Sequence, residues 1–406
     1  MRAMFRLLVT VFALTSLTGC GLFFKKPAIT QKTSLIKLAP SDYPVFSDTY
    51  VFENLKESIQ RSLDYFKRVP PDREYYFGSD TVSAQRMIAT LQYFLNFVQT
   101  HPSQGQLTHF INSNFMVYQS VGSNRRHEVL FTGYFEPVIQ GSLSKSAEYC
   151  YPIYALPSDL IFADLSLFSS QFPKERIIGR LEGNQLIPYY NRREIEENNR
   201  LKSHAEIIAW TNDLIDLFFL QIQGSGKIQL DTGSVLHVHY QASNGHPYRS
   251  IGRLLIDEGK ISKEEMSMQK IRTYLEENPH EIKRILNHNP SYVFFQLEPE
   301  GPIGSLQEKL TAARSIALDY RIFPSGALAY VETVRPELDA TGHISQWIDL
   351  NGFVLNQDTG GAIRGPGRAD FFWGSGHYAK LAAGHMQHPG SLFFLVLKPE
   401  LPANGL

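Results

Sequence analysis

A glycine-rich block near the C-terminal end carries the residues best suited to chemistry. Residues 356–376 hold two aspartates, Asp358 and Asp370, two arginines, Arg364 and Arg368, and six glycines. Glycines at this density let backbone N–H groups approach a ligand closely. We expect the two carboxyl groups to converge near Arg364 or Arg368, where they would suit acid and base catalysis. A polar loop with solvated carboxylates is the alternative interpretation.

Other catalytic motifs are incomplete. Residues 365–370 begin like a dinucleotide fingerprint but have Asp370 where the third glycine is required. Lys227 is followed by Ile228, which has no hydroxyl to hold the Mg²⁺ of a P-loop. Ser225 lacks the spacing of a nucleophile elbow. The histidine pairs have no supporting ligands, so we expect no metal and no cofactor.

The composition limits the choice of partner. The chain has 406 residues, of which 43% are hydrophobic and 19% charged, so it should fold into two or three domains. Thirty-nine Lys and Arg residues against 40 Asp and Glu residues give a net charge of −1. This balance offers no electrostatic case for nucleic acid. A neutral carbohydrate stays possible, and the 20 tyrosines would suit it.

Helices are expected before the chemistry-bearing part. Apolar residues recur at helical spacing over residues 55–66, before Pro70, and over residues 87–98, before Pro102. Ser79 or Asp80 is the expected cap of the second helix, and a third helix is expected from Gln106. Ser262 to Glu265 match a capping box, so a helix should follow and end before Pro279.

Strands dominate the rest of the chain. Residues 129–135 are β-branched and aromatic, and similar runs occur at residues 218–223, 235–240, 327–334, 345–350 and 392–397. Irregular connections between short strands fit a mainly β architecture with some helices better than a doubly wound sheet.

The N-terminus has the features of an export signal. Arg2 and Arg6 precede a short apolar stretch over residues 7–14, and residues 17–20, Leu-Thr-Gly-Cys, resemble the bacterial lipobox. We expect residues 1–19 to be removed and Cys20 to carry the lipid anchor, with residues 20–42 as a tether. Gly21 follows the cysteine, which in the lipoprotein sorting pattern implies the periplasmic face of the outer membrane. Cys150 would then be an incidental thiol without a disulfide partner.

Six segments in order resemble the MltA family of membrane-bound lytic murein transglycosylases, and the match runs from about Phe131 to Leu397. Besides the glycine block, they are residues 131–137, Phe-Thr-Gly-Tyr-Phe-Glu-Pro, residues 151–154, residues 221–226, residues 245–252 and residues 289–295. Within the match, Asp319, Asp358 and Asp370 resemble the aspartate trio that names the three-aspartate domain.

The resemblance implies a fold as well. It implies a double-psi β-barrel domain that carries the N-terminal helices and is built from residues 43–136 and 299–406. Residues 137–298 would form an inserted β-rich domain. A groove between the two would take a glycan strand.

For the chemistry, the resemblance implies that Asp370 acts as acid and then base in cleaving the β-1,4 bond between N-acetylmuramic acid and N-acetylglucosamine, with formation of a 1,6-anhydro end. Asp319 and Asp358 would support Asp370 by raising its pKa. An inverting glycosidase, in which Asp319 or Asp358 activates water, is one alternative. A lipoprotein that binds peptidoglycan without cleaving it is another.

Sugar contacts should come from flat rings, amides and backbone donors. The candidates are Tyr134, Gln221, Gln223, Gly224, Ser225, Tyr248, Gly360 and Gly361. The expected partners are peptidoglycan glycan strands, the lipids of the outer membrane, and murein synthases or scaffold proteins. The protein itself is expected to be a monomer.

Overall fold

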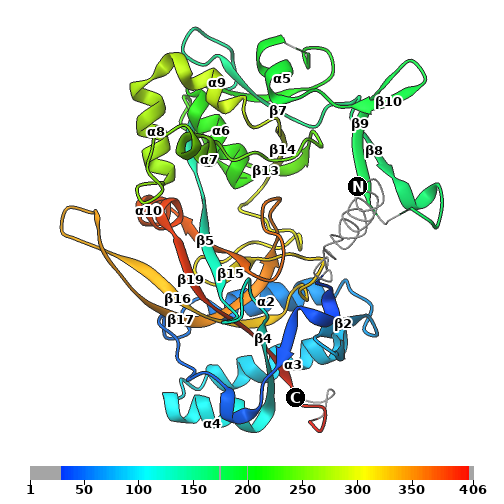
Figure 1. Cartoon of the computed structure of the whole chain (residues 1–406), viewed down its shortest axis with the longest axis vertical. Coiled ribbons are helices and arrows are strands. Elements are labelled where there is room, and N and C mark those ends of the chain that lie inside the picture. The colour runs from blue at the N-terminus through cyan, green and yellow to red at the C-terminus, as the bar shows by residue number, and fades with distance from the viewer. Residues whose placement is uncertain (1–28, 173–174, 199, 402–406) are drawn as a thin grey trace, which may run out of the picture.

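The computed structural model describes residues 29–172, 175–198 and 200–401 (Figure 1). Its larger sheet is built from both ends of the described chain. In spatial order its strands are β1 (Leu35–Lys37), β4 (Phe115–Ser120), β19 (Gln387–Leu397), β16 (Leu328–Leu338), β17 (Ile344–Asp358), β15 (Ser315–Ala317), β18 (Arg368–Ser375) and β5 (Val129–Glu136). Because β5 also pairs with β19, the six strands from β19 to β5 close into a barrel.

The barrel holds one large apolar core. Phe131, Leu355, Phe371 and Phe394 are fully buried there, on four different strands. Most of its pairings are antiparallel, but β15 runs parallel to β17 and β18 runs parallel to β5. The two parallel pairs bring distant chain segments side by side, which is how the glycine block comes to lie beside the strand at residue 131.

Helices from the N-terminal part of the described chain cover the larger sheet. They are α2 (Leu55–Phe66), α3 (Ala84–Val98) and α4 (Gln104–Asn114), and the hairpin of β2 (Glu74–Phe77) and β3 (Asp80–Ser83) lies between the first two. The predicted helices over residues 55–66 and 87–98 are confirmed. The predicted cap was wrong: Ser83 caps α3 by accepting the backbone N–H of Arg86. Asp80 begins β3 three residues before Ser83, so it is too far from the first turn of α3 to cap it.

A second body lies between β5 and β15 in sequence. Its six-stranded sheet has the order β14 (Val293–Glu298), β13 (Val235–Ser243), β12 (Ser225–Leu230), β6 (Val138–Ser142), β11 (Ile207–Thr211) and β7 (Tyr151–Tyr154). Its helices are α5 (Arg192–Asn198), α6 (Leu214–Gln223), α7 (Ile251–Asp257), α8 (Met268–Glu277) and α9 (Ile282–Leu286). This insert has separate apolar cores of its own. Figure 1 shows it above the barrel.

Helix α6 corrects the prediction of a strand at residues 218–223. Asp213 caps α6 by accepting the N–H groups of Ile215 and Asp216, and Gly224 ends it with a φ of 79°. The helix is buried nearly all round, so its sequence is a continuous apolar run. Periodicity cannot separate such a run from a buried strand.

Two other boundaries differ from expectation. The backbone N–H of Glu265 donates to Ser262 Oγ as expected, but the Ser262 hydroxyl donates to the Glu265 carboxylate and the pair lies in a turn. Helix α8 begins only at Met268, with Ser267 as its cap. Strand β1 lies within the predicted tether and pairs with β4, so the folded sheet begins earlier than we expected. The remaining elements are a three-stranded sheet, β8 (Ile161–Asp164), β9 (Arg176–Glu182) and β10 (Gln185–Pro188), and helix α10 (His377–His385).

Candidate active site

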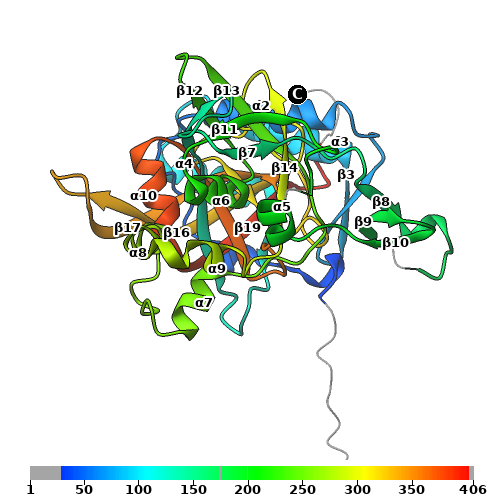
Figure 2. The same ribbon diagram turned by 90° about the horizontal axis from the view of Figure 1, so that it is seen from above.

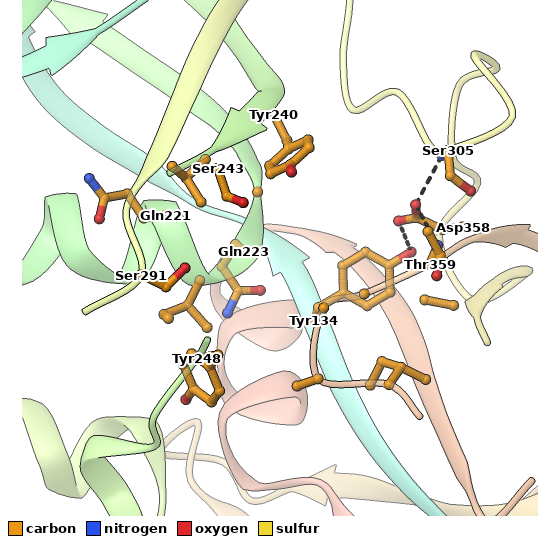
Figure 3. A pocket seen from close by; sticks show the side chains of 18 of the residues that line it. Tyr134, Gln221, Gln223, Tyr240, Ser243, Tyr248, Ser291, Ser305, Asp358 and Thr359 are labelled. Carbon is orange, nitrogen blue, oxygen red and sulfur yellow. Dashed lines mark hydrogen bonds between the residues drawn. The ribbon is translucent and has the colours of Figure 1, made fainter. Parts of the chain in front are cut away.

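A cavity of about 760 Å³ opens between the barrel and the insert. Figure 3 shows Tyr134, Asp358 and Ser305 on its barrel side, facing Gln223, Tyr248 and other polar residues of the insert. Residues from both bodies line it, so neither body forms the cavity alone.

Sheet register brings the two aspartates of the glycine block to this cavity. Ala317 on β15 lies opposite Asp358 on one side and opposite Asp370 on the other. Residues paired in this way point to the same face of a sheet, and two strand spacings put their Cα atoms about 10 Å apart. The small side chain of Ala317 leaves the space between the two carboxyl groups open to the cavity.

Asp370 is held by its neighbours on the next strand. Thr132 on β5 lies opposite Asp370, and its hydroxyl donates to Asp370 Oδ1 at 2.7 Å. The guanidinium of Arg368 donates in turn to Thr132 Oγ1 at 3.3 Å. Burial raises the pKa of Asp370 to about 6, although the Thr132 hydrogen bond and the Arg368 charge act to lower it. Asp370 therefore holds a proton far more readily than an ordinary aspartate.

Asp358 is held by three donors. Tyr134 donates its hydroxyl to Oδ2 at 2.8 Å, and the backbone N–H groups of Ser305 and Thr359 donate to Oδ1 at 3.0 and 2.8 Å (Figure 3). Burial raises the pKa of Asp358 to about 6 against these hydrogen bonds, and the charge of Asp370 adds to the rise. An ionised Asp370 therefore disfavours ionisation of Asp358.

Asp319 does not join the other two aspartates. It is fully buried and accepts hydrogen bonds from both sides of the Arg321 guanidinium, at 2.8 and 2.7 Å, and from the backbone N–H of Gly365 at 2.8 Å. Burial would raise its pKa, but these hydrogen bonds outweigh it and hold the pKa of Asp319 below its usual range. Asp319 lines a second, shallower cavity together with Gly365 and Pro366. Its hydrogen bond with the N–H of Gly365 holds the glycine loop in place.

All eight residues predicted to contact sugars line the cavity: Tyr134, Gln221, Gln223, Gly224, Ser225, Tyr248, Gly360 and Gly361. The amide oxygen of Gln223 accepts the N–H of Phe135 at 3.0 Å, which leaves its NH₂ group for the cavity. Gln221 and Ser225 are buried in the wall, whereas Tyr248 is 44% exposed and offers the face of its ring.

Several residues at the site were not predicted from the sequence. Thr132 was missed although a strand places residues two apart on one face, so the choice of Tyr134 could have led to it. Tyr240 and Tyr320 line the cavity with exposed rings, one from the insert and one from the barrel. Nothing in the sequence indicates that these two tyrosines line one cavity, because one belongs to the insert and the other to the barrel.

The remaining predictions concern the lipid anchor, the second cysteine and a metal ion. Cys20 lies outside the described residues, and Cys150 is a half-buried thiol. In the described ranges, no helix has both the length and the apolar character that crossing a membrane requires. Within those same residues, no group of three or more His, Cys, Asp or Glu side chains is arranged to hold a metal ion.

Known proteins resemble this chain over both bodies. Residues 130–296 match the family model of the MltA specific insert domain, and residues 314–396 match that of the 3D domain. The membrane-bound lytic murein transglycosylase A of Escherichia coli strain K12 is 35% identical over 285 residues, which cover 70% of this chain and 69% of the relative. The chain belongs to the MltA family of membrane-bound lytic murein transglycosylases.

Other members agree with this assignment. The Vibrio cholerae enzyme of the same name is 31% identical over 280 residues, or 68% of each chain. A crystal structure of a membrane-bound lytic murein transglycosylase from Agrobacterium tumefaciens superposes with a TM-score of 0.73 at 27% identity, covering 90% of this chain and 98% of that one. The E. coli MltA structure with bound chitohexaose gives a TM-score of 0.69 at 26% identity, covering 93% and 97%. The resemblance to the MltA family is thereby confirmed.

Proposed function

We propose that this MltA-family protein cleaves the β-1,4 bond between N-acetylmuramic acid and N-acetylglucosamine in peptidoglycan, with Asp370 as the single acid and base. The observation that carries the proposal is the place of Asp370: a carboxyl group with a pKa of about 6, in a cavity lined by rings, amides and hydroxyls. Family membership supports the reaction class, and the chitohexaose-bound relative supports a glycan as the substrate.

The first step needs a proton on Asp370. A glycosidic oxygen leaves readily only when it is protonated. With a pKa of about 6, about a tenth of Asp370 is protonated at pH 7, roughly a hundredfold more than at the ordinary value of 3.8. Asp370 gives this proton to the oxygen of the leaving N-acetylglucosamine as the bond from that oxygen to C1 breaks.

The second step returns the proton. Asp370, now charged, takes the proton of the C6 hydroxyl of N-acetylmuramic acid while that oxygen bonds to C1 and closes the 1,6-anhydro ring. No water enters the product, and the enzyme ends with its proton restored. The Thr132 hydroxyl, oriented by Arg368, keeps Asp370 Oδ1 in place through both steps.

Asp358 has a supporting role in this proposal. Its three donors tie together β5, the start of the glycine loop and the segment at Ser305. Asp319 supports the loop from the far side through Gly365. The eight predicted contacts that line the cavity, Gln223 and Tyr248 among them, are proposed to bind the sugars.

The architecture is proposed in the same terms as the family resemblance. Residues 43–136 with 299–406 would form the three-aspartate domain as a double-psi barrel, and residues 137–298 the inserted domain, with a glycan groove between them. The two parallel strand pairs of the six-stranded barrel and the separate cores of the insert support this division.

The location follows from the N-terminal sequence. We propose that Cys20 carries the lipid anchor and holds the enzyme at the periplasmic face of the outer membrane as a monomer, within reach of murein synthases or scaffold proteins. The lipobox-like residues 17–20 and the membrane-bound names of the relatives support this location.

An inverting glycosidase is the competing reaction, because Asp358 lies across the open space from Asp370 and could activate a water there. Digestion of purified murein in heavy-oxygen water, followed by mass spectrometry of the released muropeptides, separates the two. We expect anhydro ends without heavy oxygen. Reducing ends that carry heavy oxygen would contradict transglycosylation and favour hydrolysis.

A further inference from the structure

The three-stranded sheet β8–β9–β10 is joined to the smaller apolar core of the insert through Ile178 of β9. Figures 1 and 2 show it projecting from the side of the insert. Leu181 lies opposite Leu186 in the sheet, and Ile177 lies four residues before Leu181, so all three point to one face. All three are exposed, Leu181 to 61%.

The loop from β8 to β9 continues this apolar character. Leu167 is 83% exposed and Phe168 is 72% exposed, and Phe172 is exposed as well. Residues 165–172, Leu-Ser-Leu-Phe-Ser-Ser-Gln-Phe, contain no charged side chain. Large apolar side chains gathered on a surface in this way indicate a protein or membrane contact. We call Leu167, Phe168 and Phe172 with Ile177, Leu181 and Leu186 the apolar edge.

The described chain begins on the same side of the molecule. Ile29 to Lys32 and Arg321 line one shallow cavity. Asp319 chiefly raises the pKa of Arg321 through its hydrogen bonds, and the charge of Glu175, the residue just before β9, adds to this rise. Figures 1 and 2 show the start of the described chain and the sheet β8–β9–β10 on the same side of the molecule.

The length of the tether then limits how far the membrane can be. Ile29 lies nine residues after Cys20, and nine such steps of extended chain span at most about 30 Å. A lipid on Cys20 would hold this side of the protein against the bilayer. Leucine and phenylalanine are side chains that enter the boundary between lipid headgroups and acyl chains. Residues 165–172 carry no charged side chain, and the charged residues Lys174 and Glu175 follow them in the sequence.

We propose that the apolar edge rests on the phospholipid bilayer and forms a second membrane contact beside the lipid anchor. The proposal rests on the proposed anchor at Cys20. The contact would turn a flexible attachment into an oriented one, because two separate points on the membrane restrict how the protein can rotate. A protein partner for the same edge is the alternative, and the short distance along the chain from Cys20 to the start of the fold favours lipid.

The test uses the full-length lipoprotein in vesicles of phosphatidylethanolamine and phosphatidylglycerol. Cys150 is replaced by serine, and an environment-sensitive fluorophore is attached at Leu167→Cys. The matched control is the same label at Leu143→Cys, another leucine of the insert, 61% exposed. We expect the label at 167 to shift its emission to the blue and to be quenched by brominated phospholipid, and the label at 143 to do neither.

The outcomes separate the edge from the anchor. Protein that does not float with the vesicles would contradict both proposals. Protein that floats while the label at 167 behaves as it does in water would leave the anchor intact and overturn the membrane contact, favouring a protein partner instead. As a second measurement, Leu167→Ser with Phe168→Ser should keep flotation and murein cleavage but abolish quenching of a label at Phe172→Cys.

Discussion

At Asp370, burial and hydrogen bonding act in opposite directions. Burial raises the pKa of the carboxyl group to about 6, while Thr132 and Arg368 act to lower it. An acid catalyst needs its pKa near the working pH, because it must hold the proton before the reaction and release it during the reaction. The residues around Asp370 therefore set the fraction of this carboxyl group that is protonated at a given pH.

Removal of the Thr132 hydroxyl tests this balance. Since kcat/KM requires protonated Asp370, it should fall as pH rises through about 6. Thr132→Val keeps the volume but loses the hydrogen bond that lowers the pKa, so the fall should move to higher pH, and the maximal rate should decrease. Thr132→Ser should restore the position of the fall. A loss of activity with no movement of the pH profile would give Thr132 a merely structural role.

Stability should respond to the same buried carboxyl group. Because the pKa of Asp370 is raised in the fold, its ionised form weakens the fold above pH 6, and this penalty vanishes as pH falls toward 3.8. Asp370→Asn should therefore raise the free energy of unfolding by about 1–3 kcal/mol at pH 8 and have little effect near pH 4. Denaturant unfolding at the two pH values measures this difference.

Asp319→Asn is the matched control. The pKa of Asp319 is lowered, so its ionised form stabilises the fold above pH 3.8, and that contribution is lost as pH falls through the lowered value. The variant should lose stability at pH 8, by about 1–3 kcal/mol, because the hydrogen bonds with Arg321 and Gly365 are weakened. Equal effects of the two substitutions would contradict the different roles assigned to them.

Among the elements, β5 carries much of the site because its alternate residues Thr132 and Tyr134 reach the two carboxyl groups. Between them, Gly133 points to the other face, where α10 and Trp373 pack closely. A Cβ atom there would lie 2.6 Å from Trp373 Nε1 and 2.9 Å from Ala383 Cα. The close approach of α10 to the barrel therefore depends on this glycine.

Gly133→Ala should destabilise the protein by about 1–3 kcal/mol, since it forces the helix or the indole to move. Gly105→Ala is the matched control, because position 105 is in helix α4 and has no atom within 4 Å of the added methyl group. That substitution should stabilise the protein by about 0.5–1 kcal/mol. Thermal unfolding of both variants checks the pair, and a neutral Gly133→Ala would show that α10 is not held as closely as described.

The elements also show what the sequence could predict. Helix α2 was predictable because its apolar residues form one stripe, and β5 because its residues are β-branched and aromatic. Helix α6 was not, because it is buried on nearly every side and so shows no stripe. The cap of α3 was missed because the short hairpin β2–β3 depends on packing rather than on a local signal.

At the scale of the whole molecule, the cavity exists because the chain forms the insert between β5 and β15, and the insert packs beside the barrel. The glycine block indicated Asp358 and Asp370, and the order of motifs indicated the family. The separation of Asp319 from the pair was beyond the sequence, because it depends on the register of β15 between β17 and β18. That Tyr240 of the insert and Tyr320 of the barrel line one cavity was also beyond the sequence, because this depends on how the two bodies pack together.

The central claim is that one carboxyl group, that of Asp370, supplies both proton transfers. The most direct measurement compares wild type and Asp370→Asn on purified murein, by the rate at which anhydro-muropeptides are released. We predict a loss of at least about a thousandfold in the variant, which should bind glycan strands as wild type does and unfold no earlier at pH 8. An Asp370→Asn protein that still releases anhydro-muropeptides within tenfold of the wild-type rate would contradict the account.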